Sequence, residues 1–104
     1  VESFDLGKSR KGIRVKNESS KQINPAAPGN VVYAGSGLRG YGNLVIIKHS
    51  DKVLSAYANN EDILVEVGQS ITQADPISNL NENQIVYFEI RRDGSPVDPL
   101  KFLK

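Results

Sequence analysis

The sequence predicts an all-β domain, built as a small β-sandwich or partly open barrel of short antiparallel strands. Short runs of apolar and β-branched residues recur at intervals of roughly ten residues, with turn residues between them. No stretch sustains a helical apolar period over three turns. The chain has 104 residues, of which 38% are hydrophobic and 24% charged. These values are typical of one globular domain, so we expect a single domain over residues 1–104.

The first half of the chain contains the clearest hairpin. Ile13 and Val15 alternate within a basic, polar segment, which predicts one short strand. A loop punctuated by prolines precedes a second strand at 31–34. Residues 43–49 form the most apolar run, and 53–58 return after a polar turn. We therefore expect these two segments to pair as a hairpin.

The second half adds several shorter strands and one long one. Short strands are expected within 61–67, at 70–72, at 76–80 and at 95–97, and a longer strand at 84–92. Side chains alternate along a strand, so Val86, Phe88 and Ile90 share an apolar face that should enter the core. The opposite face carries Ile85, Tyr87 and Glu89 and is expected to line a groove or the surface.

The composition excludes several classes of function. Thirteen basic and twelve acidic residues give a net charge of +1, which does not indicate binding to nucleic acid or to an anionic membrane. There is no cysteine, and the longest apolar run, 44–47, is too short to span a bilayer. The sequence begins at Val1 without Met, so we expect a mature product or an excised domain.

Catalytic chemistry has few candidates in this sequence. Zinc hydrolases use two or three His residues with a carboxylate. This chain has a single His, His49, and its position before a turn indicates a structural role. A Ser-His-Asp site would need the same His, and Ser36 lacks the nucleophile-elbow spacing. A catalytic pair of carboxylates remains an alternative among Glu61, Asp62, Glu66 and Glu89. We therefore expect a protein that binds a partner, without a cofactor and without enzymatic activity.

Four stretches carry a resemblance to a known family. They are 11–13 (KGI), 31–49 (VVYAGSGLRGYGNLVIIKH), 54–58 (LSAYA) and 88–103 (FEIRRDGSPVDPLKFL). In order and spacing they resemble the LytM, or lysostaphin-type, domain of zinc metallopeptidases that cut peptidoglycan peptides. The glycine-rich and C-terminal stretches are most similar to the NlpD/EnvC branch. This resemblance implies the LytM fold, a duplicated hybrid motif.

The chain departs from active members of that family at the metal-binding motifs. Active members carry His-x-Gly-Ile-Asp, Tyr-Ala-His and His-x-His-Phe-Glu. The corresponding positions here hold Arg10 and Arg14, then Asn59, then Ile85 and Tyr87. Arg14 would place a permanent cation where a dication should bind. The resemblance thus implies a degenerate, zinc-free site.

Degenerate domains of this branch activate periplasmic N-acetylmuramoyl-L-alanine amidases during daughter-cell separation. The resemblance implies that role here, at the cell envelope. It also implies that the chain is the C-terminal domain of a longer envelope protein, an outer-membrane lipoprotein. The expected contacts with the amidase are Arg14, Leu38, Arg39, Tyr41, Tyr57, Asn59, Ile85, Tyr87 and Glu89. Two alternatives remain: a scaffold that binds peptidoglycan or another envelope protein, and a peptidase with a relocated site.

Overall fold

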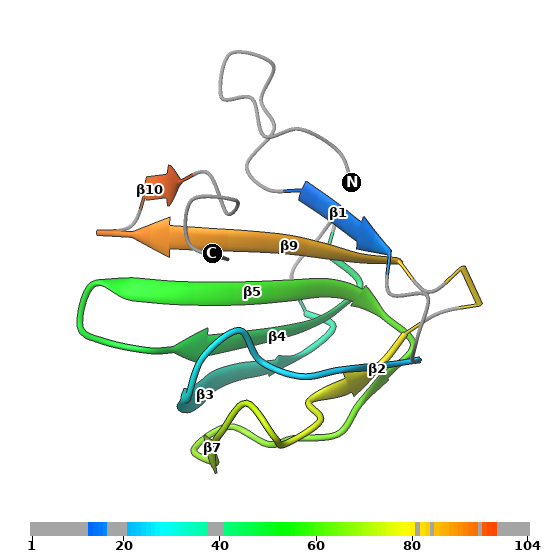
Figure 1. Ribbon diagram of the computed structural model, residues 1–104, viewed down its shortest axis with the longest axis horizontal. Helices are drawn as coiled ribbons and strands as arrows, with labels where there is room; N and C mark the ends of the chain where they lie inside the picture. Colours follow the sequence, from blue (N-terminus) through cyan, green and yellow to red (C-terminus); the bar gives the residue numbers. More distant parts are fainter. Residues whose placement is uncertain are drawn as a thin grey trace.

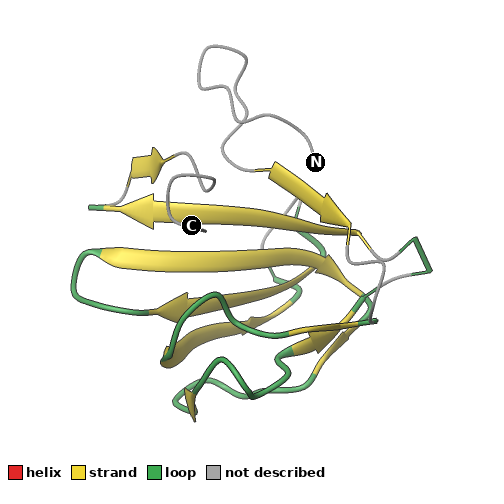
Figure 2. Ribbon diagram, in the orientation of Figure 1, coloured by secondary structure: helices red, strands yellow, loops and turns green. Residues whose placement is uncertain are grey.

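The computed structural model describes residues 13–16, 21–37, 41–80, 82–83, 85–93 and 95–97. All regular structure in these ranges is β-strand (Figure 2). No helix long and apolar enough to cross a bilayer occurs among these residues. The strands are β1 (Ile13–Lys16), β2 (Gln22–Ile23), β3 (Gly29–Gly35), β4 (Asn43–Lys48), β5 (Val53–Asn60), β6 (Asp62–Ile63), β7 (Ser70–Ile71), β8 (Ser78–Asn79), β9 (Ile85–Arg92) and β10 (Ser95–Val97).

The described strands form two antiparallel sheets. The large sheet has the order β1-β9-β5-β4-β3-β7, with β10 also paired to β9 (Figure 1). The small sheet has the order β2-β8-β6. Neither sheet closes on itself as a barrel, and the prediction of an all-β fold of short antiparallel strands is confirmed.

The hydrophobic core lies between the small sheet and one face of the large sheet. Val86, Phe88 and Ile90 enter this core from β9, which confirms the face predicted from strand alternation. Ile77 and Leu80, on either side of β8, complete it from the opposite side. The remaining buried members are Val31, Val45, Ile47, Tyr57, Val65 and Ile71.

The predicted hairpin at 43–49 and 53–58 is present as β4 and β5. Its turn is closed by the His49 amide, which donates to the Val53 carbonyl at 3.0 Å. At the other end of β5, the buried Asn60 side chain donates to the carbonyls of Asn43 at 3.1 Å and Tyr57 at 2.8 Å. Its amide oxygen accepts from the Ser78 hydroxyl at 2.8 Å. Asn60 therefore ties the large sheet to the small one.

Gly29 marks the closest backbone approach at the start of β3. A Cβ added there would lie 2.5 Å from the Lys48 carbonyl oxygen and 2.7 Å from Ile47 Cγ2. Real Cβ atoms do not come that close to backbone, so only glycine fits without a shift of β4. This residue fixes how tightly β3 and β4 pair.

Candidate functional site

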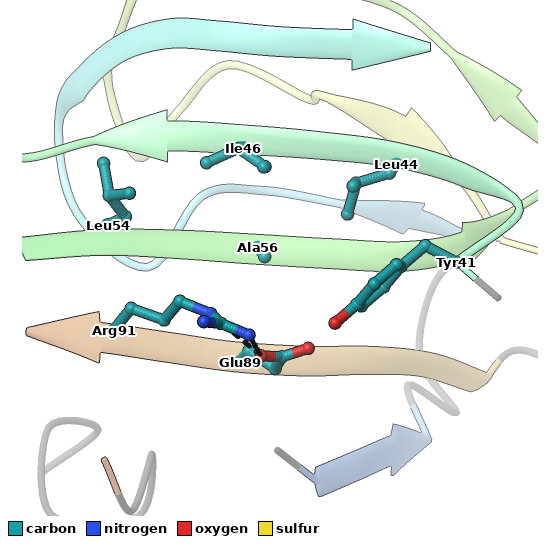
Figure 3. Close-up of a pocket in the computed structure, with 7 residues that line it drawn as sticks. All are labelled: Tyr41, Leu44, Ile46, Leu54, Ala56, Glu89 and Arg91. Carbon is teal, nitrogen blue, oxygen red and sulfur yellow. Dashed lines mark hydrogen bonds and ion pairs between the residues drawn. The ribbon is translucent and has the colours of Figure 1, made fainter. Parts of the chain in front are cut away.

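The candidate site lies on the face of the large sheet that points away from the core. Ile46, Ala56 and Glu89 lie opposite one another across β4, β5 and β9, so their side chains share this face. Together with residues on either side they enclose a pocket of about 230 Å³ (Figure 3). The pocket is lined by Tyr41, Leu44, Ile46, Leu54, Ala56, Glu89 and Arg91.

Glu89 is the buried charge of this pocket, with 1% of its surface exposed. Its Oε1 accepts hydrogen bonds from Arg91 Nη2 at 3.1 Å and from Arg91 Nε at 3.3 Å (Figure 3). Its Oε2 is also buried. Arg91 thus offsets the charge of the carboxylate, and the Tyr41 hydroxyl is a further hydrogen-bond donor to it.

Tyr41 forms the wall of the pocket on the side of Tyr87 and Asn59. Its hydroxyl points towards Glu89 (Figure 3). Burial raises the pKa of the Tyr41 hydroxyl, and the negative charge of Glu89 raises it further. Its ring centroid is 6.2 Å from that of Tyr87. Its carbonyl accepts a hydrogen bond from the Asn59 amide at 2.9 Å, which fixes the segment before β4 against the end of β5.

Three of the positions that the sequence comparison predicts to be degenerate ligand positions, Arg14, Ile85 and Tyr87, lie together on β1 and β9. Arg14 on β1 lies directly opposite Tyr87 on β9, and Lys16 lies opposite Ile85. Directly opposite residues in antiparallel strands share a face, so Arg14, Ile85 and Tyr87 form one surface. The Arg14 side chain is exposed, whereas Ile85 and Tyr87 are half-buried.

Asn59 is the remaining predicted ligand position that the structure describes. Asn59 is exposed at the end of β5 and has a positive φ of 64°. Arg10, Leu38 and Arg39 lie outside the described residues.

Tyr57 does not fit the predicted partner surface. It lies opposite Phe88 on the core face, with 3% of its surface exposed and the two ring centroids 5.2 Å apart. Alternation from Leu54 and Ala56 already assigns Tyr57 to the opposite face. We therefore correct that interpretation and exclude Tyr57 from the partner surface.

The Tyr57 hydroxyl ends a buried hydrogen-bond chain that begins at His49. His49 Nδ1 lies 2.9 Å from the Pro28 carbonyl oxygen, which can only accept, so Nδ1 carries the proton. In neutral His49, Nε2 then accepts from the Ser55 hydroxyl at 2.7 Å. The Tyr57 hydroxyl lies 2.8 Å from Ser55 Oγ and accepts from the Ala26 amide at 2.9 Å. His49 is thus bound on both sides within the fold.

Among the described residues, metal-ligating side chains do not converge on the candidate site. In the part of the chain that the structure describes, no group of three or more His, Cys, Asp or Glu residues could hold a metal ion. The apolar residues of β4 and β5 that line the pocket, and Arg91, were not predicted from the sequence. The alternation of Leu54 and Ala56 on one side of β5 was the available signal.

The fold and site define a class of protein: a two-sheet antiparallel domain whose large sheet presents an apolar pocket beside an arginine–tyrosine surface. The model of Peptidase family M23 matches residues 8–99, and the chain belongs to this family. This confirms the resemblance to LytM domains.

Similar proteins come from bacteria. The chain is 45% identical over 101 residues to the lipoprotein NlpD/LppB homolog of Pseudomonas aeruginosa, covering 93% of this chain and 34% of that protein. It is 41% identical over 108 residues to the murein hydrolase activator NlpD of Escherichia coli, covering 99% and 28%. The chain therefore spans about a third or less of these relatives' length.

A solved structure shows the same fold. Csd3 of Helicobacter pylori superposes with a TM-score of 0.85 at 21% identity, over 99% of this chain and 30% of that one. At this level of identity the likeness concerns the fold alone.

Proposed function

We propose that this chain is a non-catalytic LytM domain that binds and activates a periplasmic N-acetylmuramoyl-L-alanine amidase during daughter-cell separation. The observation that carries the proposal is the pairing of Arg14 with Tyr87 at two positions where active members hold zinc ligands. Relatives at 41% identity named as murein hydrolase activators support the same role. Relatives named as lipoproteins support a location at the cell envelope.

The residues at the family's metal positions do not fit zinc. Zinc in proteins is bound by Cys, His, Asp or Glu. Arg14 offers a guanidinium with no lone pair, and the side chain of Ile85 offers no donor atom. Arg14 also repels a dication electrostatically. On this proposal the domain works without metal, and its effect on peptidoglycan is exerted through the amidase.

The proposed partner surface consists of Arg14, Tyr41, Asn59, Ile85 and Tyr87, with the Glu89 pocket beside it. We call it the partner face. Tyr and Arg are enriched among the residues that dominate binding energy at protein interfaces. The rings of Tyr41 and Tyr87 pack against each other. The antiparallel pairing of β1 with β9 holds Arg14 next to Tyr87. Rigid aromatic anchors of this kind lose little conformational entropy on binding.

The experiment that tests the proposal is turnover of purified peptidoglycan by an amidase, with and without this chain. We expect the wild type to stimulate turnover, and the double variant Arg14→Ala, Tyr87→Ala to lose most of the stimulation. The matched control is Glu66→Ala, Val67→Ala, which alters two exposed residues in the β6–β7 loop. The absence of stimulation by the wild type would refute the proposed function. Equal stimulation by both double variants would refute the proposed surface.

Sedimentation with purified sacculi separates the scaffold alternative from activation. A domain that acts through the amidase is expected to stay in the supernatant unless the amidase is present. Co-sedimentation of the chain alone would instead indicate that peptidoglycan itself is the ligand.

A further inference from the structure

A bulge in β5 lies directly beside Tyr41. The register of β4 against β5 shifts between Asn43 and Val45, because β5 has one residue more than β4 over this stretch. Within the bulge, Asn59 has a left-handed φ of 64°. This conformation is uncommon for residues other than glycine, and it clusters at functional sites, where surrounding contacts hold it in place. Because bulges redirect neighbouring side chains, this one bears on the orientation of Tyr41.

Hydrogen bonds fasten the start of β4 and the residues before it to the bulged end of β5. The Asn59 amide donates to the Tyr41 carbonyl at 2.9 Å. The Asn43 side-chain amide donates to the carbonyls of Asn60 at 3.1 Å and Glu61 at 2.9 Å. In return, the Asn60 side chain donates to the Asn43 carbonyl at 3.1 Å. Asn43 takes part in three of these bonds, so it is the main connection between the two segments.

Gly42 links Tyr41 to this connection. Its φ of 60° is left-handed, so the chain turns between Tyr41 and Asn43. The direction in which the Tyr41 ring leaves the sheet is therefore set by backbone that Asn43 anchors. The ring centroid lies 6.2 Å from that of Tyr87, and the hydroxyl points towards Glu89 and donates to it (Figure 3). Tyr41 is thus held both at its backbone and at its ring.

We propose that Asn43 is a positioning residue for amidase activation, which holds Tyr41 on the partner face in the orientation that the amidase binds. The inference rests on the proposed function for its partner. A side chain that must be ordered on binding costs free energy, and a side chain that is already ordered avoids this cost. Asn43 is not part of the partner face, so its effect on activation is exerted through Tyr41.

The effect of Asn43→Ala on Tyr41 can be measured without the amidase. The variant loses both donations of the side-chain amide. NMR of the 104-residue chain detects the contact between the Tyr41 and Tyr87 rings as a nuclear Overhauser effect, and titration gives the pKa of Tyr41. In the wild type, burial and the charge of Glu89 raise this pKa above 10.0. We expect Asn43→Ala to weaken the ring contact and to return the pKa of Tyr41 towards 10.0, because the ring moves away from Glu89.

The matched control is Tyr57→Phe, which also loses two hydrogen bonds, but on the core face. A general loss of stability would affect both variants alike. A positioning role predicts instead that Tyr57→Phe leaves the ring contact and the pKa of Tyr41 unchanged. Asn43→Ser, whose hydroxyl donates only one hydrogen bond, replaces Asn43→Ala if that variant does not fold. An unchanged Tyr41 in the folded Asn43 variant, or the same change in Tyr57→Phe, would overturn the inference.

The amidase assay tests what the position of Tyr41 contributes to activation. In Asn43→Ala, we expect the chain concentration for half-maximal stimulation to rise about three- to tenfold, with the maximum unchanged, because one anchoring side chain must now be ordered on binding. Tyr57→Phe should match the wild type. A wild-type concentration dependence for Asn43→Ala with a displaced Tyr41 would overturn the inference and leave the proposed function standing. No stimulation by the wild type would instead overturn the proposed function, and the NMR measurements would still decide whether Asn43 positions Tyr41.

Discussion

Replacing Tyr57 by Phe removes one hydroxyl from the core face and leaves the ring in place. That hydroxyl accepts a hydrogen bond from the Ala26 amide at 2.9 Å and lies 2.8 Å from Ser55 Oγ. Each such bond contributes about 1 kcal/mol net, and a partner left unpaired adds to the loss. We therefore expect Tyr57→Phe to lower the free energy of unfolding by about 2 kcal/mol.

The corresponding change in melting temperature follows from the size of the chain. The entropy of unfolding is about 2.1 cal/mol/K per residue. For 104 residues this gives about 0.2 kcal/mol/K, so a loss of about 2 kcal/mol lowers the melting temperature by about 9 °C. Calorimetry or thermal circular dichroism measures it.

The matched control is Tyr33→Phe, whose hydroxyl accepts from the Gly37 amide at 2.9 Å in an exposed position. We expect it to cost less than about 1 kcal/mol, because water can replace the lost partner. A melting temperature for Tyr57→Phe within about 2 °C of the wild type would show that the two hydrogen bonds of this hydroxyl contribute little to stability. Loss of amidase stimulation by folded Tyr57→Phe would show that its hydroxyl acts at the partner face after all.

The raised pKa of the Tyr57 hydroxyl predicts that the stability of the fold depends on pH. Burial raises the pKa of Tyr57 above its ordinary value of 10.0. Below about pH 10 the hydroxyl is neutral in both states, so its contribution to stability is fully present. As the pH rises towards the folded-state pKa, the unfolded chain ionises first and stability falls by up to about 1.4 kcal/mol per pH unit. Denaturant unfolding at rising alkaline pH should therefore show a shrinking difference between wild type and Tyr57→Phe.

Three further substitutions test the packing around the site. Gly29→Ala should destabilise the fold by about 2 kcal/mol or more, since its Cβ meets the Lys48 carbonyl oxygen, and denaturant unfolding measures it. Asn60→Ala removes three hydrogen bonds, two of them buried, and should lower the melting temperature by about 10 °C. A change below about 3 °C would contradict the role of Asn60 in joining the two sheets. Arg91→Leu removes the cation beside the buried Glu89 carboxylate and should lower the free energy of unfolding by about 2–3 kcal/mol. The loss is smaller than for a fully buried ion pair, because Arg91 is partly exposed. Arg91→Lys is its control and should cost less than Arg91→Leu.

The local pattern of residues predicted most of the fold. Alternating apolar residues identified β9 and its core face, and a polar turn between two apolar runs identified the β4–β5 hairpin. β2 was not predicted, because Gln22–Ile23 is too short to show an alternation of apolar and polar residues. Its strand character comes from pairing with β8. Pairing of this kind depends on contacts distant in sequence, which local patterns do not contain.

The candidate site was harder to predict for the same reason. The motif comparison identified Arg14 and Tyr87, but their direct opposition depends on the register of β1 against β9. The pocket requires β4, β5 and β9 to align in one row, with Tyr41 entering from before β4. Tyr57 was misjudged because a family motif gave its position along the chain, whereas strand alternation decides its face.

Amidase turnover of purified peptidoglycan, measured with this chain and a metal chelator present, shows whether the domain activates without metal. The amidase should be one that remains active with the chelator, so that only the metal dependence of the activator is tested. We expect the wild type to stimulate turnover equally with and without chelator, and the Arg14→Ala, Tyr87→Ala variant not to stimulate it. Peptide cleavage by the chain alone, abolished by the chelator and accompanied by stoichiometric zinc in the purified protein, would show instead that the domain is a metallopeptidase.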